Sequence, residues 1–540
     1  MTAVLNPSLV TLPGRGGIAA EILRRLEAVG ERPVLAALRP TWPERTDPAG
    51  PADGYSWADL TGRELAGRIR AVAGGLRSDG IRAGDRVALL GGNTPDWIVL
   101  DLAVLAAGAI TVPIYPTASR IQIEHVLADS GATRVFAETP SQVELSRGEP
   151  FAEAVARLSG GEAPDAGEIG ADDIATIVYT SGTTGTPKGC VLTHRNLFAA
   201  AGNVVTYLPE LFARDDASTL LFLPLSHVFG RVSALGCLWA GVRTGLLASA
   251  AELAAELPRF RPSFLVLVPY ALEKLRKGAR AGGLTPELES EAVAAGAAWS
   301  GSAAETFRAA LGGRLDHVIC GGAPLDPTTA AFTAALGVQV LGAYGLTEST
   351  TVVSMSSPSA VEPGRVGRAL PGCEVLIADD GEILVRGEQV SPGYWPLVGE
   401  PEPWLRTGDL GEVDRDGFLA ITGRRKEIIV TSGGKNVAPE PLEDRIRLHA
   451  GVAHAVVIGE GRPYVSALVF PEPGALLDDA AVEAAVDDAN TLVSRAESIR
   501  RWRIVDGALS VADGTLTPSL KLRRAAVAER YAADIAALYS

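Results

Sequence analysis

Sulfur-bearing side chains are scarce in this chain of 540 residues, which contains four cysteines and two methionines. The cysteines are far apart and lack the spacing of a metal site; they are Cys190, Cys237, Cys320 and Cys373. Unpaired, buried thiols are typical of a reducing compartment, so we expect neither disulfides nor a zinc site. The cysteine content therefore predicts a cytosolic protein.

Positive charge is also in deficit. The sequence has 49 Lys and Arg residues against 64 Asp and Glu residues, which gives a net charge of -15 at pH 7. Non-specific binding to nucleic acids or anionic membranes requires a basic surface, so we predict no nucleic-acid partner. An anionic small ligand is still compatible with this charge, because a local site can be rich in backbone amides.

Long uninterrupted apolar runs are missing as well. The most apolar segments, 97–114 and 219–248, are interrupted by Asp101, and by His227 and Arg231. A membrane-spanning helix needs about 20 predominantly apolar residues, so both segments predict buried helices and strands. The N-terminus has no basic stretch before an apolar core, so we expect no signal peptide. Peripheral contact with a membrane is left open.

Short apolar runs that alternate with Ala-rich amphipathic stretches make up most of the chain. Five of these runs are RVALLGG (86–92), AITVPIY (109–115), TRVFAE (133–138), FLVLVPY (264–270) and HVICGG (317–322). Buried strands that alternate with helices predict an α/β fold with largely parallel, stacked sheets. The length predicts more than one domain.

The pattern changes after Gly408. The segment EVDRDGFLAI (412–421) predicts a hairpin whose turn lies at 414–417. The runs VAHAVVIG and YVSALVF then predict strands of a compact α+β unit. We therefore predict a large N-terminal α/β domain over residues 1–422 and a small α+β domain over residues 423–540.

A segment rich in glycine and hydroxyl side chains, YTSGTTGTPKGC (179–190), directly follows the apolar run IATIVY. Its first residues after the tyrosine are Thr180, Ser181, Gly182, Thr183, Thr184 and Gly185. Glycines let the backbone approach phosphate oxygens, amides and hydroxyls donate to them, and Lys188 adds a charge that suits a polyphosphate. The Walker A order GxxxxGK[ST] is not present. The segment predicts a phosphate-binding loop of another kind.

At these residues the chain resembles the adenylate-forming superfamily, which includes acyl- and aryl-CoA synthetases, luciferases and the adenylation domains of peptide synthetases. Further motifs follow in the family's order, and they are GGAPL (321–325), GAYGLTEST (342–350), the stretch 404–439 and LTPSLKLRR (516–524). The resemblance covers roughly residues 55–530. It implies a large region that carries the nucleotide and acyl sites, and a small mobile C-terminal domain.

The resemblance implies an adenosine site in which Tyr344 stacks on the adenine. Asp409 would accept hydrogen bonds from the ribose hydroxyls, and Arg424 would be the second ribose contact. The backbone beside the base would come from two motifs, namely Gly321, Gly322, Ala323 and Gly345.

The resemblance also implies catalytic roles. Thr347 would donate to the α-phosphate, and Glu348 would hold Mg²⁺, with Thr180 as a second oxygen ligand. Lys521 would reach from the small domain to the reacting carboxylate, where a cation stabilises the charge that develops on phosphorus. Lys426 matches the hinge position of the family.

The implied reaction has two steps. A carboxylate attacks the α-phosphate of ATP and expels pyrophosphate, and the thiol of coenzyme A then attacks the acyl adenylate and releases AMP. Such a reaction needs no nucleophile from the protein. We therefore predict an acyl-CoA synthetase that uses ATP, Mg²⁺, coenzyme A and a fatty acid.

The identity of the acid rests on LPLSHVFGRV (223–232), which resembles the long-chain synthetase form. The resemblance places His227, Phe229 and Arg231 at the acyl pocket, so the acid is predicted to be a medium- or long-chain fatty acid. Burial of each methylene contributes about 0.8 kcal/mol, so the length of a tunnel sets the preferred acid. Gly230 departs from the family, where many long-chain members have Glu.

Two other functions share these motifs. An acyl-AMP ligase that passes its acyl group to an acyl carrier protein would keep every nucleotide motif. An inactive nucleotide-binding paralogue is the non-enzyme alternative. Such a paralogue would be expected to lose some of the functional residues, whereas this chain has Lys188, Glu348, Asp409, Arg424 and Lys521.

Overall fold

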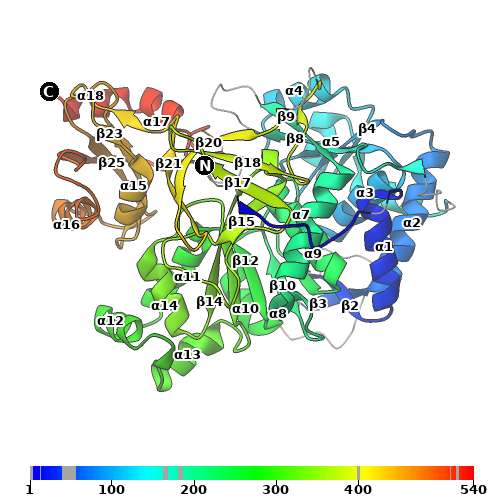
Figure 1. The fold of residues 1–540 in the computed structure, drawn as a ribbon, viewed down its shortest axis with the longest axis horizontal. Helices are drawn as coiled ribbons and strands as arrows, with labels where there is room; N and C mark the ends of the chain where they lie inside the picture. The colour runs from blue at the N-terminus through cyan, green and yellow to red at the C-terminus, as the bar shows by residue number, and fades with distance from the viewer. Residues whose placement is uncertain are drawn as a thin grey trace.

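The computed structural model describes residues 4–12, 14–38, 56–161, 168–180, 187–397, 402–510, 513–517 and 522–540. Four β-sheets and their helices precede residue 425, and two further sheets follow it. Figure 1 shows the second group, in orange and red, at one side of the larger body. The fold is the mixed α/β arrangement that the alternating apolar runs predicted.

The first sheet has seven strands in the order β19-β9-β8-β5-β4-β6-β7. These are Gly393–Tyr394, Lys188–Thr193, Ile174–Thr180, Ile110–Ile114, Arg86–Leu90, Arg134–Ala137 and Glu149–Pro150. The strands β4, β5 and β6, which are parallel, confirm three of the predicted runs. Strands β8 and β9 form an antiparallel hairpin whose two ends, Thr180 and Lys188, are paired.

The second sheet has the order β12-β13-β14-β15-β16 and contains the other two predicted runs. Its strands are Phe264–Leu267, His317–Gly321, Gln339–Leu346, Thr351–Met355 and Arg368–Ala369. The first three strands are parallel, and β15 returns antiparallel to β14. A third sheet has the order β10-β11-β2-β3, with strands Ser218–Leu221, Arg243–Leu246, Pro33–Leu38 and Trp57–Thr61.

Helices α7 (His194–Tyr207) and α9 (Val228–Ala240) pack against each other in the middle of the larger body (Figure 1). They join one large core with the helices at the N-terminal side, which are α1 (Gly17–Val29), α2 (Gly62–Ser78) and α3 (Pro95–Ala106). The same core reaches the second and third sheets. The remaining helices before residue 340 are α4 (Arg120–Ser130), α5 (Pro140–Ser146), α6 (Phe151–Leu158), α8 (Pro209–Phe212), α10 (Leu253–Phe260), α11 (Pro269–Ala281), α12 (Pro286–Ala295), α13 (Ser302–Ala310) and α14 (Pro327–Ala335).

The charges that interrupt the two apolar segments neutralise each other. Arg231 of α9 donates through Nε to Asp101 Oδ2 of α3 at 2.8 Å, and through Nη1 to Thr176 Oγ1 at 2.6 Å. Both charged side chains are almost completely buried. The two segments are therefore helices and strands of a water-excluding core, as predicted. Within the described residues, the structure has no helix that is long and apolar enough to span a membrane.

A fourth, antiparallel sheet has the order β1-β17-β18-β20-β21. Its strands are Val4–Leu5, Cys373–Ile377, Glu382–Gly387, Leu405–Val413 and Leu419–Arg424. Strands β20 and β21 are the predicted hairpin, and their register pairs Asp409 with Arg424. Asp414 holds the turn by accepting hydrogen bonds from the backbone N–H groups of Asp416 and Phe418, each at 2.9 Å.

The C-terminal part has helices on both faces of one sheet, β24-β25-β26 (Val452–Ile458, Ser466–Pro471 and Arg501–Ile504). Successive residues of β24 point to opposite faces, since Val457 joins one core and Val456 joins the other. The first core includes α15 (Pro439–Arg447) and α16 (Asp479–Asn490), and the second includes α17 (Arg524–Arg530) and α18 (Ala532–Leu538). A small ribbon, β22 (Ile429–Val430) with β23 (Asn436–Val437), precedes them.

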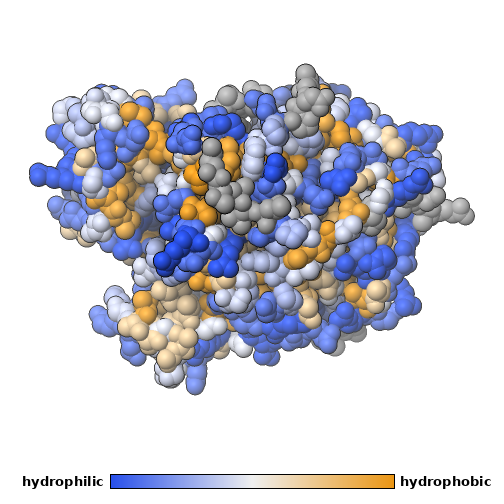
Figure 2. All heavy atoms as spheres, in the orientation of Figure 1, coloured by the Kyte–Doolittle hydropathy of each residue, from blue (hydrophilic) through white to orange (hydrophobic). Residues whose placement is uncertain are grey.

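Ion pairs join the C-terminal part to α11 and to the start of α14. Arg445 Nη1 lies 3.0 Å from Asp326 Oδ2, and Lys277 Nζ lies 2.7 Å from Glu472 Oε1. Lys277 also donates to the carbonyl oxygen of Val452. The contact is polar, unlike the apolar cores on either side of it. On the face that Figure 2 shows, apolar residues lie in patches separated by hydrophilic ones.

Candidate active site

The motif GAYGLTEST spans the end of β14 and a short 3-10 turn, Thr347–Ser349. A β-bulge lies between Tyr344 and Gly345, where β14 pairs with β15. A Cβ at Gly345 would lie 1.3 Å from the carbonyl oxygen of Thr351, so only glycine fits at this position. The bulge and the turn bring Tyr344, Thr347 and Glu348 to one end of the sheet.

Tyr344, Asp409 and Arg424, the residues predicted for adenosine, are in direct contact. The phenol of Tyr344 donates to Asp409 Oδ2 at 2.8 Å, and Arg424 Nε donates to Oδ1 at 2.7 Å. Burial, and then the charge of Asp409, raise the pKa of Tyr344 well above its ordinary value, so the phenol stays a donor. An ionised carboxylate has about four acceptor sites, so Asp409 keeps capacity for further donors such as hydroxyls.

The GGAPL motif lies beside Tyr344. Gly321 ends β13 and is paired with Ala343, and a Cβ on Gly321 would lie 2.6 Å from the carbonyl oxygen of Ala343. Gly322 has φ 90°, a left-handed conformation that favours glycine. Gly322 and Ala323 are exposed, so their backbone is accessible next to the tyrosine.

Glu348 is in contact with a residue that the sequence analysis did not select. The phenol of Tyr394 donates to Glu348 Oε1, and Lys188 Nζ lies 5.9 Å from the centroid of the Tyr394 ring. Burial, and then the charge of Glu348, raise the pKa of Tyr394 well above its ordinary value. Strand β19 places Tyr394 here by pairing with Cys190 of β9. The position of Tyr394 depends on the pairing of two strands that are far apart in the sequence. No local sequence pattern predicts this pairing.

The two ends of the predicted phosphate loop lie in strands β8 and β9. Thr180 and Lys188 are the paired ends of the β8–β9 hairpin, and His125 Nε2 lies 2.8 Å from the carbonyl oxygen of Pro187. The loop residues between them, which include Ser181, Gly182, Thr183, Thr184 and Gly185, lie outside the described residues, as does Lys521. Lys188, at one end of the loop, is near the Tyr394 ring, and Tyr394 contacts Glu348. The described ends of the loop are therefore close to Glu348.

Hard-cation ligands are few among the residues that the structure describes. That part of the chain holds no group of three or more His, Cys, Asp or Glu side chains suited to a metal ion. Mg²⁺ usually takes one or two carboxylates from the protein and the rest of its ligands from phosphates and water. One carboxylate, Glu348, which Tyr394 links to Lys188 at the end of the predicted phosphate loop, fits that pattern.

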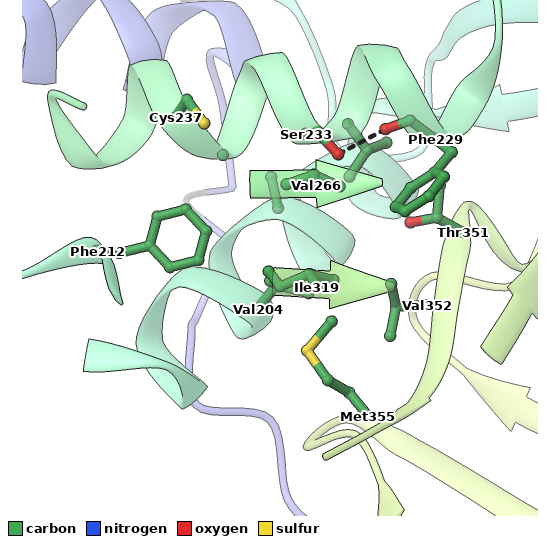
Figure 3. Close-up of a pocket in the computed structure, with 13 residues that line it drawn as sticks. Val204, Phe212, Phe229, Ser233, Cys237, Val266, Ile319, Thr351, Val352 and Met355 are labelled. Atoms are coloured by element: carbon green, nitrogen blue, oxygen red, sulfur yellow. Dashed lines mark hydrogen bonds between the residues drawn. The ribbon is translucent and has the colours of Figure 1, made fainter. Parts of the chain in front are cut away.

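An apolar cavity is lined in part by Thr351, which follows Glu348 by three residues in the sequence (Figure 3). Its walls come from α7, α8, α9, β12, β13 and β15, and Phe229 is one of its lining residues. The cavity volume is about 30 Å³, roughly what one water occupies in the liquid. An acyl chain would therefore need side chains of the wall to move apart.

The three residues predicted for the acyl pocket lie in different surroundings in the structure. Phe229 lines the cavity, and His227 caps α9 by accepting a hydrogen bond on Nδ1 from the backbone N–H of Phe229 at 3.1 Å. Arg231, in contrast, is 2% exposed and turned to Asp101. Arg231 therefore points to a different side of α9 from Phe229, because residues two positions apart on a helix face different sides, and its role in the acyl pocket stays a prediction.

The predicted hinge residue lies between the two parts of the fold. Lys426 is exposed in the turn that separates β21 from β22. No secondary structure element crosses this position, so a rotation there would not break a strand or helix.

Comparison with known proteins agrees with this geometry. The AMP-binding enzyme family matches residues 40–395, and the AMP-binding enzyme C-terminal domain matches residues 426–540. Long-chain-fatty-acid–CoA ligase FadD15 of Mycobacterium bovis is 39% identical over 557 aligned positions, which cover 90% of this chain and 93% of that protein.

Solved structures share the fold. The anthranilate CoA ligase AuaEII in complex with anthranoyl-AMP has a TM-score of 0.76 and 20% identity, over 97% of this chain and 99% of that one. The A-PCP didomain of carboxylic acid reductase from Segniliparus rugosus has a TM-score of 0.79 and 23% identity, over 98% of this chain and 83% of that one. This chain belongs to the AMP-binding enzyme family, the adenylate-forming superfamily that its motifs predicted, on the fatty-acyl-CoA synthetase branch.

Proposed function

We propose that this protein is an ATP-dependent, AMP-forming acyl-CoA synthetase that activates a medium- or long-chain fatty acid. The observation that carries the proposal is the meeting of two residue groups at the end of β14. Tyr344, Asp409 and Arg424 form one group, and Tyr394 links Glu348 to Lys188 in the other. The similarity to a long-chain-fatty-acid–CoA ligase supports the same reaction.

The adenosine would bind between Tyr344 and the exposed backbone of Gly322. The ribose hydroxyls would donate to Asp409, which Arg424 holds in place at 2.7 Å. This contact would position the α-phosphate near Thr347, three residues after Tyr344. A pre-positioned donor in a site shielded from water stabilises charge that develops in the transition state.

Lys188 and the loop 181–186 would bind the β- and γ-phosphates, which leave as pyrophosphate. Mg²⁺ would be held by Glu348, with Thr180 as a further oxygen donor, and would neutralise phosphate charge when bound. The hydrogen bond from Tyr394 occupies one acceptor position of Glu348, so the phenol would compete with the cation for this carboxylate. The carboxylate of the fatty acid would then attack the α-phosphate, while Lys521 from the C-terminal part stabilises the added charge.

The second step needs a different arrangement of the C-terminal part. We propose that the domains divide near the predicted boundary at 422–423, where β21 (Leu419–Arg424) ends, and that Lys426 is the hinge. Separate cores before and after this point support the division. The polar contact between the parts also supports it, because ion pairs separate at lower cost than an apolar interface. Coenzyme A would then attack the acyl carbon through its thiol and release AMP.

The first experiment is a product analysis with ATP, Mg²⁺, coenzyme A and fatty acids of six to eighteen carbons. Acyl-CoA, AMP and pyrophosphate in equal amounts would support the proposal. Acyl adenylate without acyl-CoA would favour a carrier protein as the acceptor, and the absence of both products would contradict fatty-acid activation. The cytosolic location remains a prediction.

A matched pair of variants tests the adenosine site. Asp409→Asn keeps the shape of the side chain but removes the charge that two donors share, so kcat/KM for ATP should fall about 10- to 100-fold. Asp59→Asn, in the pair with Arg243 at 2.8 Å, is the control, because that pair lies in the third sheet. Equal effects of both substitutions would contradict a role of Asp409 in ATP binding.

A further inference from the structure

Thr351, the first residue of β15, combines a strained backbone with an unused polar group. Its φ is 88°, in the left-handed region that a β-branched residue rarely adopts. Its side chain is 6% exposed. Within the described part of the chain, its Oγ1 has no hydrogen-bond partner.

Contacts at the carbonyl oxygen of Thr351 and at its neighbour Thr350 fix the backbone here. The hydroxyl of Ser349 donates to the carbonyl oxygen of Thr351 at 3.0 Å, and the hydroxyl of Thr350 donates to the carbonyl oxygen of Gln389 at 2.7 Å. Gly345 packs directly against the same Thr351 carbonyl. These contacts fix the turn without using the Thr351 hydroxyl. A buried hydroxyl without a partner is unfavourable, and strained residues of this kind cluster at functional sites.

The hydroxyl lies at one end of the apolar cavity. Figure 3 shows Thr351 and Ser233 beside Phe229, whereas Phe212 and Cys237 lie at the opposite end. The hydroxyl of Ser233 donates its hydrogen to the carbonyl oxygen of Phe229 at 2.7 Å. The Thr351 hydroxyl is therefore the one at this end whose hydrogen is still available to a ligand. Hydrogen-bonding capacity is thus concentrated at one end of the cavity, and the other end is apolar.

The polar end is the one near the reaction centre. Thr351 follows Glu348 by three residues through the 3-10 turn, so it is close to the place where the carboxylate of the acid would react. The first carbons of the acyl chain would pass Thr351, and the rest of the chain would extend toward Phe212. An oxygen on those first carbons is the partner that the hydroxyl lacks.

We propose that Thr351 is a specificity-determining residue that binds an oxygen substituent near the carboxylate of the substrate. This inference rests on the proposed acyl-activating function and names the substrate class as fatty acids with a hydroxyl group on one of their first carbons. A hydroxyl at the far end of the chain gains no such partner, because the apolar end would have to accept it without a hydrogen bond.

The test compares kcat/KM for three acids of equal chain length in the pyrophosphate-release assay. The acids are dodecanoic acid, 3-hydroxydodecanoic acid and 12-hydroxydodecanoic acid. For the wild-type enzyme, the 3-hydroxy acid should be preferred over dodecanoic acid about five-fold, the effect of one neutral hydrogen bond. The 12-hydroxy acid should be the poorest of the three.

Thr351→Val and Thr351→Ser are the informative variants. Valine has the same shape without the donor, so the ratio of the 3-hydroxy acid to dodecanoic acid should fall about five-fold. Serine keeps the donor and should keep the preference. Each ratio is measured within one preparation, so a reduced amount of folded enzyme cancels out of it.

The results separate the two proposals. If the wild-type enzyme activates dodecanoic acid and shows no preference for the 3-hydroxy acid, the role of Thr351 is wrong and the acyl-CoA synthetase function stands. The same conclusion follows if Thr351→Val leaves the ratio unchanged. If none of the three acids releases pyrophosphate, both the fatty-acid function and the inference are overturned.

Discussion

Removal of the Asp101 carboxylate should destabilise the protein strongly, because it leaves a buried guanidinium without its counter-charge. The side chains of Arg231 and Asp101 are 2% and 3% exposed, and Nε donates to the carboxylate at 2.8 Å. In Asp101→Ala, Arg231 would keep its hydrogen bond to Thr176 but lose its charge partner. Breaking a buried ion pair in this way costs about 3–5 kcal/mol.

Urea unfolding followed by tryptophan fluorescence measures this effect. Trp97 is a suitable probe, since its ring centroid is 6.0 Å from Arg231 Cζ. A chain of this size need not unfold in one step, so the midpoint of the first transition is the quantity to compare. The control is Glu374→Ala, which breaks a pair whose arginine, Arg386, is half exposed and should cost less than about 1 kcal/mol.

A double variant distinguishes a structural ion pair from a substrate-binding arginine. Asp101→Leu combined with Arg231→Met should recover most of the lost stability, because apolar side chains of similar size can replace a buried pair without a net penalty. The reasoning would be refuted if Arg231→Met alone left the midpoint unchanged but altered the preference among fatty acids. Arg231 would then belong to the acyl pocket, as its sequence motif predicted.

Three further predictions concern the metal site, the domain contact and the response to acid. Tyr394→Phe removes the donor to Glu348, so the Mg²⁺ concentration for half-maximal AMP formation should fall about five-fold, and a rise would contradict competition between phenol and cation. Arg445→Ala removes the ion pair to Asp326, and limited trypsin digestion should then cleave between the domains about five-fold faster than in wild type. Burial lowers the pKa of His194 to about 4, so the folded state binds fewer protons than the unfolded state, where the pKa is about 6.5. Stability should therefore fall as the pH drops from about 6.5 to 4, by up to about 3 kcal/mol, and His194→Asn should flatten this fall in unfolding midpoints. An unchanged slope would show that other groups cause it.

Much of the fold follows from local sequence patterns. Each of the five apolar runs became a buried strand, and the hairpin at 412–421 has the predicted turn. These elements depend on periodicity and turn chemistry, which are properties of adjacent residues. The hairpin also explains why Asp409 and Arg424 could be assigned together, because their register makes them neighbours in the sheet.

What the sequence did not reveal depends on contacts between distant segments. Arg231 is 130 residues from its partner Asp101 in the sequence. Each residue interrupts an apolar segment, and the sequence alone does not show that these two charges form a pair. Tyr394 reaches Glu348 through strand pairing with β9 across about 200 residues. The conformation of Thr351 is likewise set by its neighbours in space, so a run of three hydroxyl residues after Glu348 gave no sign of it.

The segment from Tyr344 to Thr351 connects all parts of the candidate site. Tyr344 contacts Asp409 at its start, Glu348 contacts Tyr394 in its turn, and Thr351 faces the acyl cavity at its end. The backbone atoms of Gly345 and Thr351 are packed too closely for any side chain between them. A shift at the acyl end would therefore be transmitted through the turn to Glu348. This coupling gives a physical reason why filling of the small cavity by an acyl chain would also adjust the carboxylate that faces the phosphates.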